Sequence, residues 1–391
     1  MRFTTALSTL LCRSLLVATF LFSGCQSKPL AIPPVYHSDL ADAVNYIADT
    51  LAMQISPQDL KNAKEVPVDL FFNEHSADEA TSSKVLQRQM IAAMSSRMQD
   101  ASFLQLNTQN IQHTKWVALA GYTNVKSEEA GKPGNWVRLK IVLADVKTGT
   151  SVARVVTYLD AKQFDATPTR FFKDAPMYLT DVAHQERNAV LSGDKRPLGD
   201  GMRLRAELGE AIKAYETGQY ADAETRFIRI VKIAPSNTGA LSGLYQALWA
   251  QGKKSEAEKV FGQLVAVGID AGKLSIKLLF KLNSIEFIEE SDLSQQYQIW
   301  LKAIAKIVAE NKTCLNITGH ASASGSVDYN EKLSLSRASR IVSRMQRITP
   351  SSDKNLTAFG KGSSEAIVGT GENNATDAID RRVEFAVRSC D

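Results

Sequence analysis

Hydrophobic residues follow two different spacings in the first half of the chain. Residues 40–53 and 82–98 carry apolar side chains at helical intervals. Strand-like runs are predicted at 66–72, 103–106, 116–122, 136–143 and 151–158. Between the last two runs, the turn sequence DVKTGT predicts a hairpin. Together these patterns predict an α/β module with a mixed or antiparallel sheet over residues 39–183.

A change of composition follows this module. Residues 184–203 hold one proline and three glycines among charged side chains, which predicts a linker. Beyond it, Gly218 and Ala223 recur 34 residues later as Gly252 and Ala257. A fixed period of this length is typical of stacked helix pairs, so we expect a helical region over residues 204–272.

The pattern changes again near residue 273. Apolar spacing predicts the order strand, helix, strand, helix, strand, strand, with the elements at 274–282, 293–308, 315–318, 328–347, 355–359 and 382–388. The predicted fold class is therefore α+β multidomain, with an α/β module, a helical segment and a second α/β unit.

The first 24 residues have the layout of a secretory signal peptide. Arg2 and Arg13 lie upstream of an apolar core at residues 15–22, and the small residues Ser23 and Gly24 follow it. The alternative is a transmembrane anchor, but the uncharged run at 14–27 is shorter than the roughly 20 residues that span a membrane. We therefore expect residues 1–24 to be removed on export.

Composition excludes several classes of protein. The 46 basic and 42 acidic residues give a net charge of +4, and losing the signal peptide halves this excess, so nucleic acid is not an expected partner. The four cysteines lack zinc-site spacing and the five histidines are scattered. HExxH, GxSxG and phosphate-loop motifs are absent. The sequence thus predicts no metal, no cofactor and no enzyme.

Residues 21–25 (LFSGC) resemble the lipobox of bacterial lipoproteins, in which the cysteine becomes the acylated first residue. Phe22 departs from the family, which usually has Leu three residues before the cysteine. The resemblance implies that Cys25 is lipidated and that residues 25–38 form a tether. Because Gln26 is not Asp, it also implies sorting to the outer membrane, with the chain facing the periplasm.

Two further resemblances concern the middle of the chain. The module at 39–183 is similar to the periplasmic modules of the FlgO, LpoB and CsgG lipoproteins, through its early helix, its strand–helix–strand order and the strand pair around LADVKTGTSVAR. Such modules bind other envelope proteins. The region at 204–272 resembles the tetratricopeptide repeat (TPR), whose closing proline is present as Pro235 and replaced by Ile269. Two repeats need a neighbour to cap them, which implies a spacer or a docking face.

The most specific resemblance covers residues 273–391. The blocks TGHASASGSVDYNEKLSLSRASRIV, FGKGSSEA and DRRVEF resemble the OmpA-like peptidoglycan-binding domain, also found in the peptidoglycan-associated lipoprotein and flagellar stator proteins. The resemblance implies a βαβαββ fold with a mixed sheet, and the diaminopimelate of the peptidoglycan stem peptide as ligand. By position, Arg337 is the clamp for the ligand carboxylate, Asn330 lies on the same helix, and Arg382 is the basic residue of the last block.

Ser322 is the main departure from that family. An aspartate usually stands there and receives the ligand's ammonium group, whereas a hydroxyl brings no charge, a difference of about tenfold in affinity. Structural alternatives stay open: Arg337 as the partner of a buried acid, His320 as a residue that orients its loop, and Ser322 as a loop cap.

Cys314 and Cys390 are the cysteines left after export and acylation of Cys25. His320 and Arg382 are both expected near the binding face, so the strands that carry them should run antiparallel. This places the two cysteines together at the other end of the sheet and predicts a disulfide.

The predicted function is that of an outer-membrane lipoprotein, not an enzyme, that binds peptidoglycan through its C-terminal domain and docks unidentified envelope proteins through its other regions. The alternative is an assembly or scaffold factor for a surface machine (pilus, flagellum or secretion system), in which Ser322 marks weak or lost peptidoglycan binding. Activation of a wall synthase is a third reading, indicated by the LpoB-like module alone.

Overall fold

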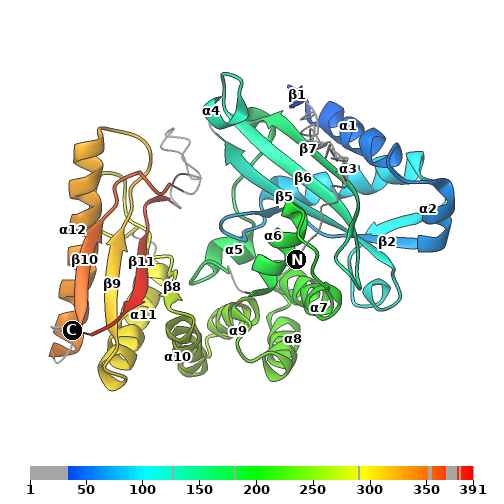
Figure 1. The fold of residues 1–391 in the computed structure, drawn as a ribbon. Helices are drawn as coiled ribbons and strands as arrows, with labels where there is room; N and C mark the ends of the chain where they lie inside the picture. The colour runs from blue at the N-terminus through cyan, green and yellow to red at the C-terminus, as the bar shows by residue number, and fades with distance from the viewer. Residues whose placement is uncertain are drawn as a thin grey trace, which may run out of the picture. The chain divides into compact units, whose positions relative to one another are not determined.

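The computed structural model describes residues 34–125, 127–179, 182–288, 291–350, 355–366, 377 and 380–390. These residues belong to one compact unit that begins at Pro34 (Figure 1). The predicted signal peptide, Cys25 and most of the predicted tether lie outside the described residues. Within them, none of the helices is both long and apolar enough to cross a membrane.

The first sheet has seven strands: β1 (Tyr36–His37), β2 (Glu65–Val68), β3 (Phe72–Asn73), β4 (Ser102–Gln105), β5 (Trp116–Val125), β6 (Trp136–Asp145) and β7 (Ser151–Asp160). Their order is β1-β7-β6-β5-β2-β4, with β3 paired to β5. Pairing is antiparallel among β5, β6 and β7 and parallel elsewhere, so the sheet is mixed. The predicted tether therefore ends earlier than residue 38, because β1 is already part of the sheet.

The turn between β6 and β7 forms as its sequence predicts. Asp145 Oδ1 accepts hydrogen bonds from the amides of Lys147 at 3.0 Å and Thr148 at 2.9 Å. Gly149 follows with φ +66°, a conformation that glycine adopts without strain. This turn sets the register of β6 and β7, which pair along their length.

Helices cover both faces of the first sheet. On one face lie α1 (Leu40–Ala52) and α3 (Thr81–Arg97), and α2 (Pro57–Ala63) connects α1 to β2. On the other face lie α6 (Val182–Ser192) and the start of α7 (Gly199–Glu216). Shorter elements are η1 (Asn110–Gln112), α4 (Ser127–Ala130), η2 (Ala161–Gln163) and α5 (Arg170–Asp174).

The linker expected at 184–203 is wrong. Val190, Leu191 and Met202 are fully buried and pack against Val117 and Leu119 of β5. Besides its charged residues and glycines, this stretch has an apolar helical face, which completes the second core of the module. The α/β module therefore extends beyond residue 183.

The helical region consists of the rest of α7 with α8 (Tyr220–Ile233), α9 (Thr238–Ala250) and α10 (Lys254–Asp270). Gly218 and Gly252 follow the first helix of each pair, with φ +78° and +75°. Ala223 and Ala257 occupy equivalent places in α8 and α10 and are fully buried. The 34-residue period of the sequence is thus a period of helix pairs.

The second sheet contains β8 (Lys273–Leu274), β9 (Cys314–Gly319), β10 (Leu356–Gly360) and β11 (Val383–Arg388), and its helices are α11 (Ser291–Glu310) and α12 (Val327–Ile348). The order is β10-β9-β11-β8, with β9 parallel to β10 and antiparallel to β11. Along the chain these elements follow in the order β8, α11, β9, α12, β10 and β11, and the strands that carry Cys314 and Val383, β9 and β11, pair antiparallel.

The strand expected at 274–282 is wrong beyond Leu274. Ser275 accepts a hydrogen bond from the amide of Tyr178 at 3.0 Å, and the amide of Lys277 donates to Pro176 O at 2.8 Å. The following residues, 279–288, fold back as a hairpin in which the amide of Ile288 donates to Leu279 O at 3.1 Å. We call this second feature the 279–288 hairpin. In place of one continuous strand, the chain therefore pairs first with residues 176–178 and then forms this hairpin.

The helical region and the second sheet share a hydrophobic core. Phe261 of α10 stacks on Trp300 of α11 with ring centroids 5.6 Å apart, and Trp300 Nε1 donates to Tyr245 OH of α9 at 2.8 Å. Helix α11 therefore covers α9 and α10 as the neighbour that two helix pairs require. A fragment that begins at residue 273 would expose Trp300, so binding experiments call for the chain from residue 34.

Helix α12 lies close against β9 and β10 (Figure 1). A Cβ atom on Gly319 would come within 1.9 Å of Ser334 O, and one on Gly360 within 2.6 Å of Leu335 N. Only glycine allows this approach, which brings the first turns of α12 over the carboxyl ends of both strands.

Gly319→Ala should destabilise the protein by about 1–3 kcal/mol, because the new methyl group meets the backbone of α12. Urea unfolding of residues 34–391 measures the change. Gly262→Ala in α10, where no atom lies within 4 Å of the added Cβ, is the matched control and should be neutral or stabilising. Equal stability of the two variants would contradict the close approach.

Cys314 and Cys390 are joined by a disulfide that closes 76 residues, with Cα atoms 5.3 Å apart. Reduction, or the Cys314→Ser/Cys390→Ser double variant, should lower the free energy of unfolding by about 4 kcal/mol on the chain-entropy model. Denaturant titrations with and without reductant test this. Alkylation of both thiols in the native, unreduced protein would show that the bond is absent.

Candidate functional site

Arg337 of α12 is fully buried at the end of the second sheet where β9 and β10 finish. Its guanidinium donates to three backbone carbonyls: Nε to Ser284 O at 3.0 Å, Nη2 to Lys281 O at 3.1 Å and Nη1 to His320 O at 3.2 Å. The ring of Phe280 lies 5.1 Å from Cζ. Arg337 therefore joins the 279–288 hairpin to the loop that follows β9.

The charge of Arg337 has no carboxylate counterpart among the described residues. Burial, and then the neighbouring Arg381, lower the pKa of Arg337 to about 10. The partial negative charges of three carbonyl oxygens are its compensation. A buried cation with dipoles but no anion as partners is suited to receive an anionic group from outside. The alternative that Arg337 pairs with a buried acid is not what the described residues show.

Asn330 and Ser322 lie in the same corner. Asn330 Nδ2 donates to Ser322 O at 3.2 Å and to Ser324 O at 2.8 Å, so the amide holds the loop after β9 in shape. The Ser322 hydroxyl is buried and lies 3.3 Å from the Ser324 hydroxyl. These contacts favour a loop-shaping role for both side chains.

Arg382 reaches the site from the start of β11. Its Nε donates to Glu384 at 2.9 Å and its Nη2 to Glu365 O at 3.2 Å, while Nη1 has no partner among the described residues. The backbone amide of His320 donates to Arg382 O at 2.9 Å. The structure thus places Ser322, Asn330, Arg337 and Arg382 together, as their positions in the sequence predict.

His320 is almost fully buried beside Arg382, and neither ring nitrogen has a hydrogen-bond partner within the described part of the chain. Burial, with Arg382 nearby, lowers its pKa to about 4, so the ring is neutral at pH 7. The nearest carboxylate oxygen, Glu365 Oε2, lies 3.8 Å from Nδ1. Sequence reasoning missed Glu365, although it stands in the block FGKGSSEA.

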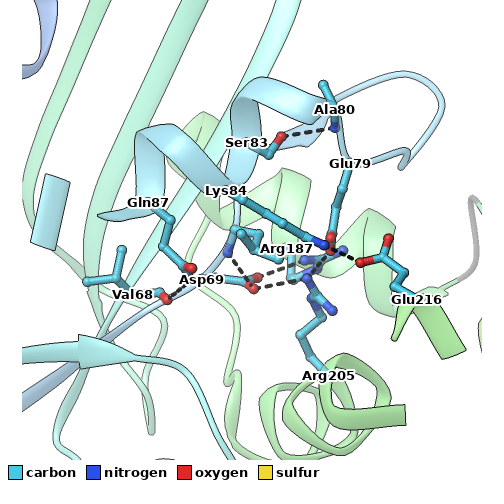
Figure 2. Close-up of polar contacts among 11 residues, drawn as sticks. Val68, Asp69, Glu79, Ala80, Ser83, Lys84, Gln87, Arg187, Arg205 and Glu216 are labelled. Atoms are coloured by element: carbon cyan, nitrogen blue, oxygen red, sulfur yellow. Dashed lines mark hydrogen bonds and ion pairs between the residues drawn. The ribbon is translucent and has the colours of Figure 1, made fainter. Parts of the chain in front are cut away.

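A second group of charged residues lies between the first sheet and α6 and α7. Figure 2 shows Arg187 and Arg205 directed at Asp69. Arg187 Nη1 lies 2.8 Å from Asp69 Oδ2, and Arg205 Nη2 lies 3.2 Å from Asp69 Oδ1. Arg205 also pairs with Glu79, and Lys84 with Glu216. Among the described residues, three cations meet three carboxylates here, so their formal charges balance.

Glu79 shows how strongly this group is buried. Burial raises the pKa of its carboxyl although Arg205 opposes the change. An adjoining cavity of about 40 Å³, lined among others by His184, Leu204 and Leu208, has room for a few water molecules only. We assign this group to the docking of α6 and α7 on the module. Within the described residues, no three His, Cys, Asp or Glu side chains form a metal site.

A model of the OmpA family matches residues 288–379. This range includes α11, β9 and α12, and with them Ser322, Asn330 and Arg337, but ends before Arg382. The C-terminal domain is therefore OmpA-like. No curated protein matches the chain.

Solved structures with a similar part include the peptidoglycan-associated lipoprotein from Burkholderia pseudomallei, with 21% identity over 28% of this chain and 88% of that one, at a TM-score of 0.25. The cell wall anchor of the T6SS from Pseudomonas aeruginosa has 26% identity over 30% and 80% of the two chains, with a TM-score of 0.25. The C-terminal domain of Helicobacter pylori MotB has 16% identity over 29% and 83%, with a TM-score of 0.25.

The low pKa of His320 predicts a loss of stability in acid. Between pH 6.5 and about 4 the unfolded state binds a proton that the native ring does not, so the free energy of unfolding falls as pH falls. His320→Gln should remove up to about 3 kcal/mol of that fall. Urea titrations at several pH values measure it. Exposed His113, changed to Gln, is the control, and equal pH profiles for both variants would argue against the buried neutral ring.

Proposed function

We propose that this protein is an outer-membrane lipoprotein whose C-terminal domain binds peptidoglycan non-covalently through the diaminopimelate of the stem peptide. The observation that carries the proposal is Arg337, a fully buried cation whose described partners are carbonyl groups and not a carboxylate. A planar guanidinium in such a place accepts a carboxylate with both charge and geometry matched. The OmpA family match over residues 288–379 supports peptidoglycan as its source.

The lipid anchor is the second part of the proposal. It rests on the sequence LFSGC and on Cys25 as the acylated residue. The compact unit begins at Pro34, nine residues after Cys25, so an anchored chain would hold the first sheet within about 30 Å of the lipid. This arrangement would leave the C-terminal domain facing the periplasm and the wall.

The third part is the docking of envelope proteins. The two helix pairs repeat with a 34-residue period and have buried alanines where helices approach, which supports the TPR-like reading of residues 204–272. Since α11 covers one end of these pairs and α7 is docked on the first module, the exposed face of α8 is left for an envelope partner. The FlgO/LpoB-like reading of the first module is part of the same proposal.

A second candidate function follows from Ser322. Its hydroxyl is buried and lies beside Ser324, and it brings no negative charge to the site. If no other acid replaces it, the domain holds peptidoglycan weakly and the protein serves as an assembly or scaffold factor for a surface machine. Binding to peptidoglycan separates the two functions.

Residues 34–391 should co-sediment with isolated peptidoglycan sacculi, and Arg337→Ala should weaken binding at least thirtyfold, a loss of about 2 kcal/mol. Arg337→Lys keeps the charge but loses the planar fork, so an intermediate affinity is expected. Arg347→Ala, at the exposed end of the same helix, is the matched control. Thermal unfolding confirms that each variant is folded.

Two results would decide against the wall-binding proposal. Absence of wild-type binding would favour the assembly factor, and wild-type binding that survives Arg337→Ala would place the wall contact elsewhere on the chain.

A further inference from the structure

The site also contains a carboxylate that can face a ligand. Arg337 Nη1 donates to the backbone oxygen of His320, and the Glu365 carboxylate lies 3.8 Å from Nδ1 of the same residue. A buried cation and a half-exposed carboxylate therefore lie next to one residue. This arrangement suits a zwitterionic ligand, whose carboxylate and ammonium groups need partners of opposite charge.

The strand order explains how Glu365 comes to lie there. Because β9 and β10 are parallel neighbours, their carboxyl ends meet at the same edge of the sheet. The amide of Ala321 donates to Gly362 O at 2.8 Å, and the amide of Lys361 donates to Gly319 O at 3.1 Å. The loop after β10 is thus bonded to the loop that carries Ser322.

Arg382 fixes the remaining part of this loop. Its Nη2 donates to the backbone oxygen of Glu365 at 3.2 Å, which holds residue 365 against the start of β11. The Glu365 side chain is 50% exposed, so its carboxylate is accessible while its backbone is fixed. A charge held in this way loses little freedom when a ligand binds.

The charge of Glu365 is not consumed inside the protein. His320 is buried, neutral at pH 7 and without a hydrogen-bond partner in the described part of the chain, so its contact with Glu365 is not an ion pair. Lys361 Nζ lies 3.2 Å from Glu365, but both side chains are about half exposed, and such surface pairs contribute little. The ammonium of a bound ligand can displace the lysine.

We propose that Glu365 is the specificity-determining acid of this domain and accepts the ammonium group of the ligand that Arg337 holds by its carboxylate. The negative charge missing at Ser322 is supplied from the neighbouring strand end. This inference rests on the proposed function, since it takes the wall stem peptide as ligand.

Sacculus binding by residues 34–391 tests the role of Glu365. Glu365→Gln should weaken binding about tenfold, because a charged hydrogen bond becomes a neutral one. Glu310→Gln is the matched control: Glu310 is 60% exposed and lies 3.8 Å from Lys306, also four residues away, at the far end of α11. It should bind like wild type. Ser322→Asp should restore binding when added to Glu365→Gln.

Chemical modification of the wall gives an independent readout. Acetic anhydride converts the free amines of sacculi to amides and removes the ammonium charge. Wild-type binding should fall about tenfold on acetylated sacculi, whereas Glu365→Gln should bind treated and untreated sacculi equally.

The outcomes separate this inference from the proposed function. If Arg337→Ala abolishes binding while Glu365→Gln binds like wild type, the role of Glu365 is wrong and wall binding stands. The same conclusion follows if acetylation of the sacculi weakens binding of Glu365→Gln by the same factor as binding of wild type. If wild type and Arg337→Ala fail alike, both proposals fall. Both proposals are supported if Ser322→Asp restores binding to Glu365→Gln and if binding of Glu365→Gln itself is unchanged by acetylation of the sacculi.

Discussion

The guanidinium of Arg337 is the contact on which the C-terminal site depends. It connects the 279–288 hairpin, through Lys281 and Ser284, to the loop after β9, through His320. Removing an arginine from water costs several kcal/mol, and carbonyl dipoles compensate this less well than a carboxylate does. This cost falls at a place where two loops and a helix meet and no structural ion pair forms among the described residues, which supports the proposed binding site. The contrast with Arg205, whose buried charge is matched by Asp69 and Glu79, is direct.

The rest of the domain keeps Arg337 in place by packing. Gly319 and Gly360 let α12 approach β9 and β10 closely, so the helix that carries Arg337 cannot shift without moving both strands. In the same core, α11 contacts α12 and packs its Trp300 against Phe261 of α10. The site is therefore supported by a core that continues into the helical region. A partner that altered the helix pairs would act on the same core that positions the site.

Sequence reasoning succeeded where one element determines its own pattern. The β6–β7 hairpin follows from its turn residues, and the 34-residue helix period follows from Gly218 and Gly252. It failed where distant segments decide. The glycines and charges of residues 184–203 predict a linker because they are local signals. The burial of Val190 and Leu191 depends on packing against β5, which is distant in the sequence. The strand expected at 274–282 ends early because residues 176–178 compete for its backbone.

The same distinction applies to the site. Arg337 and Asn330 could be placed by motif, since a seven-residue separation on one helix puts both over the strand ends. The carbonyl partners of Arg337 could not be predicted from the sequence, because every residue has a backbone carbonyl. Ser322 taken alone indicates a weakened site, as its hydroxyl carries no charge. Yet parallel strands deliver neighbouring loops to one edge, so a charge absent from the loop after β9 can be supplied by the loop after β10. Whether a domain of this topology retains its ligand is therefore a property of the whole edge, and a single substituted position does not decide it.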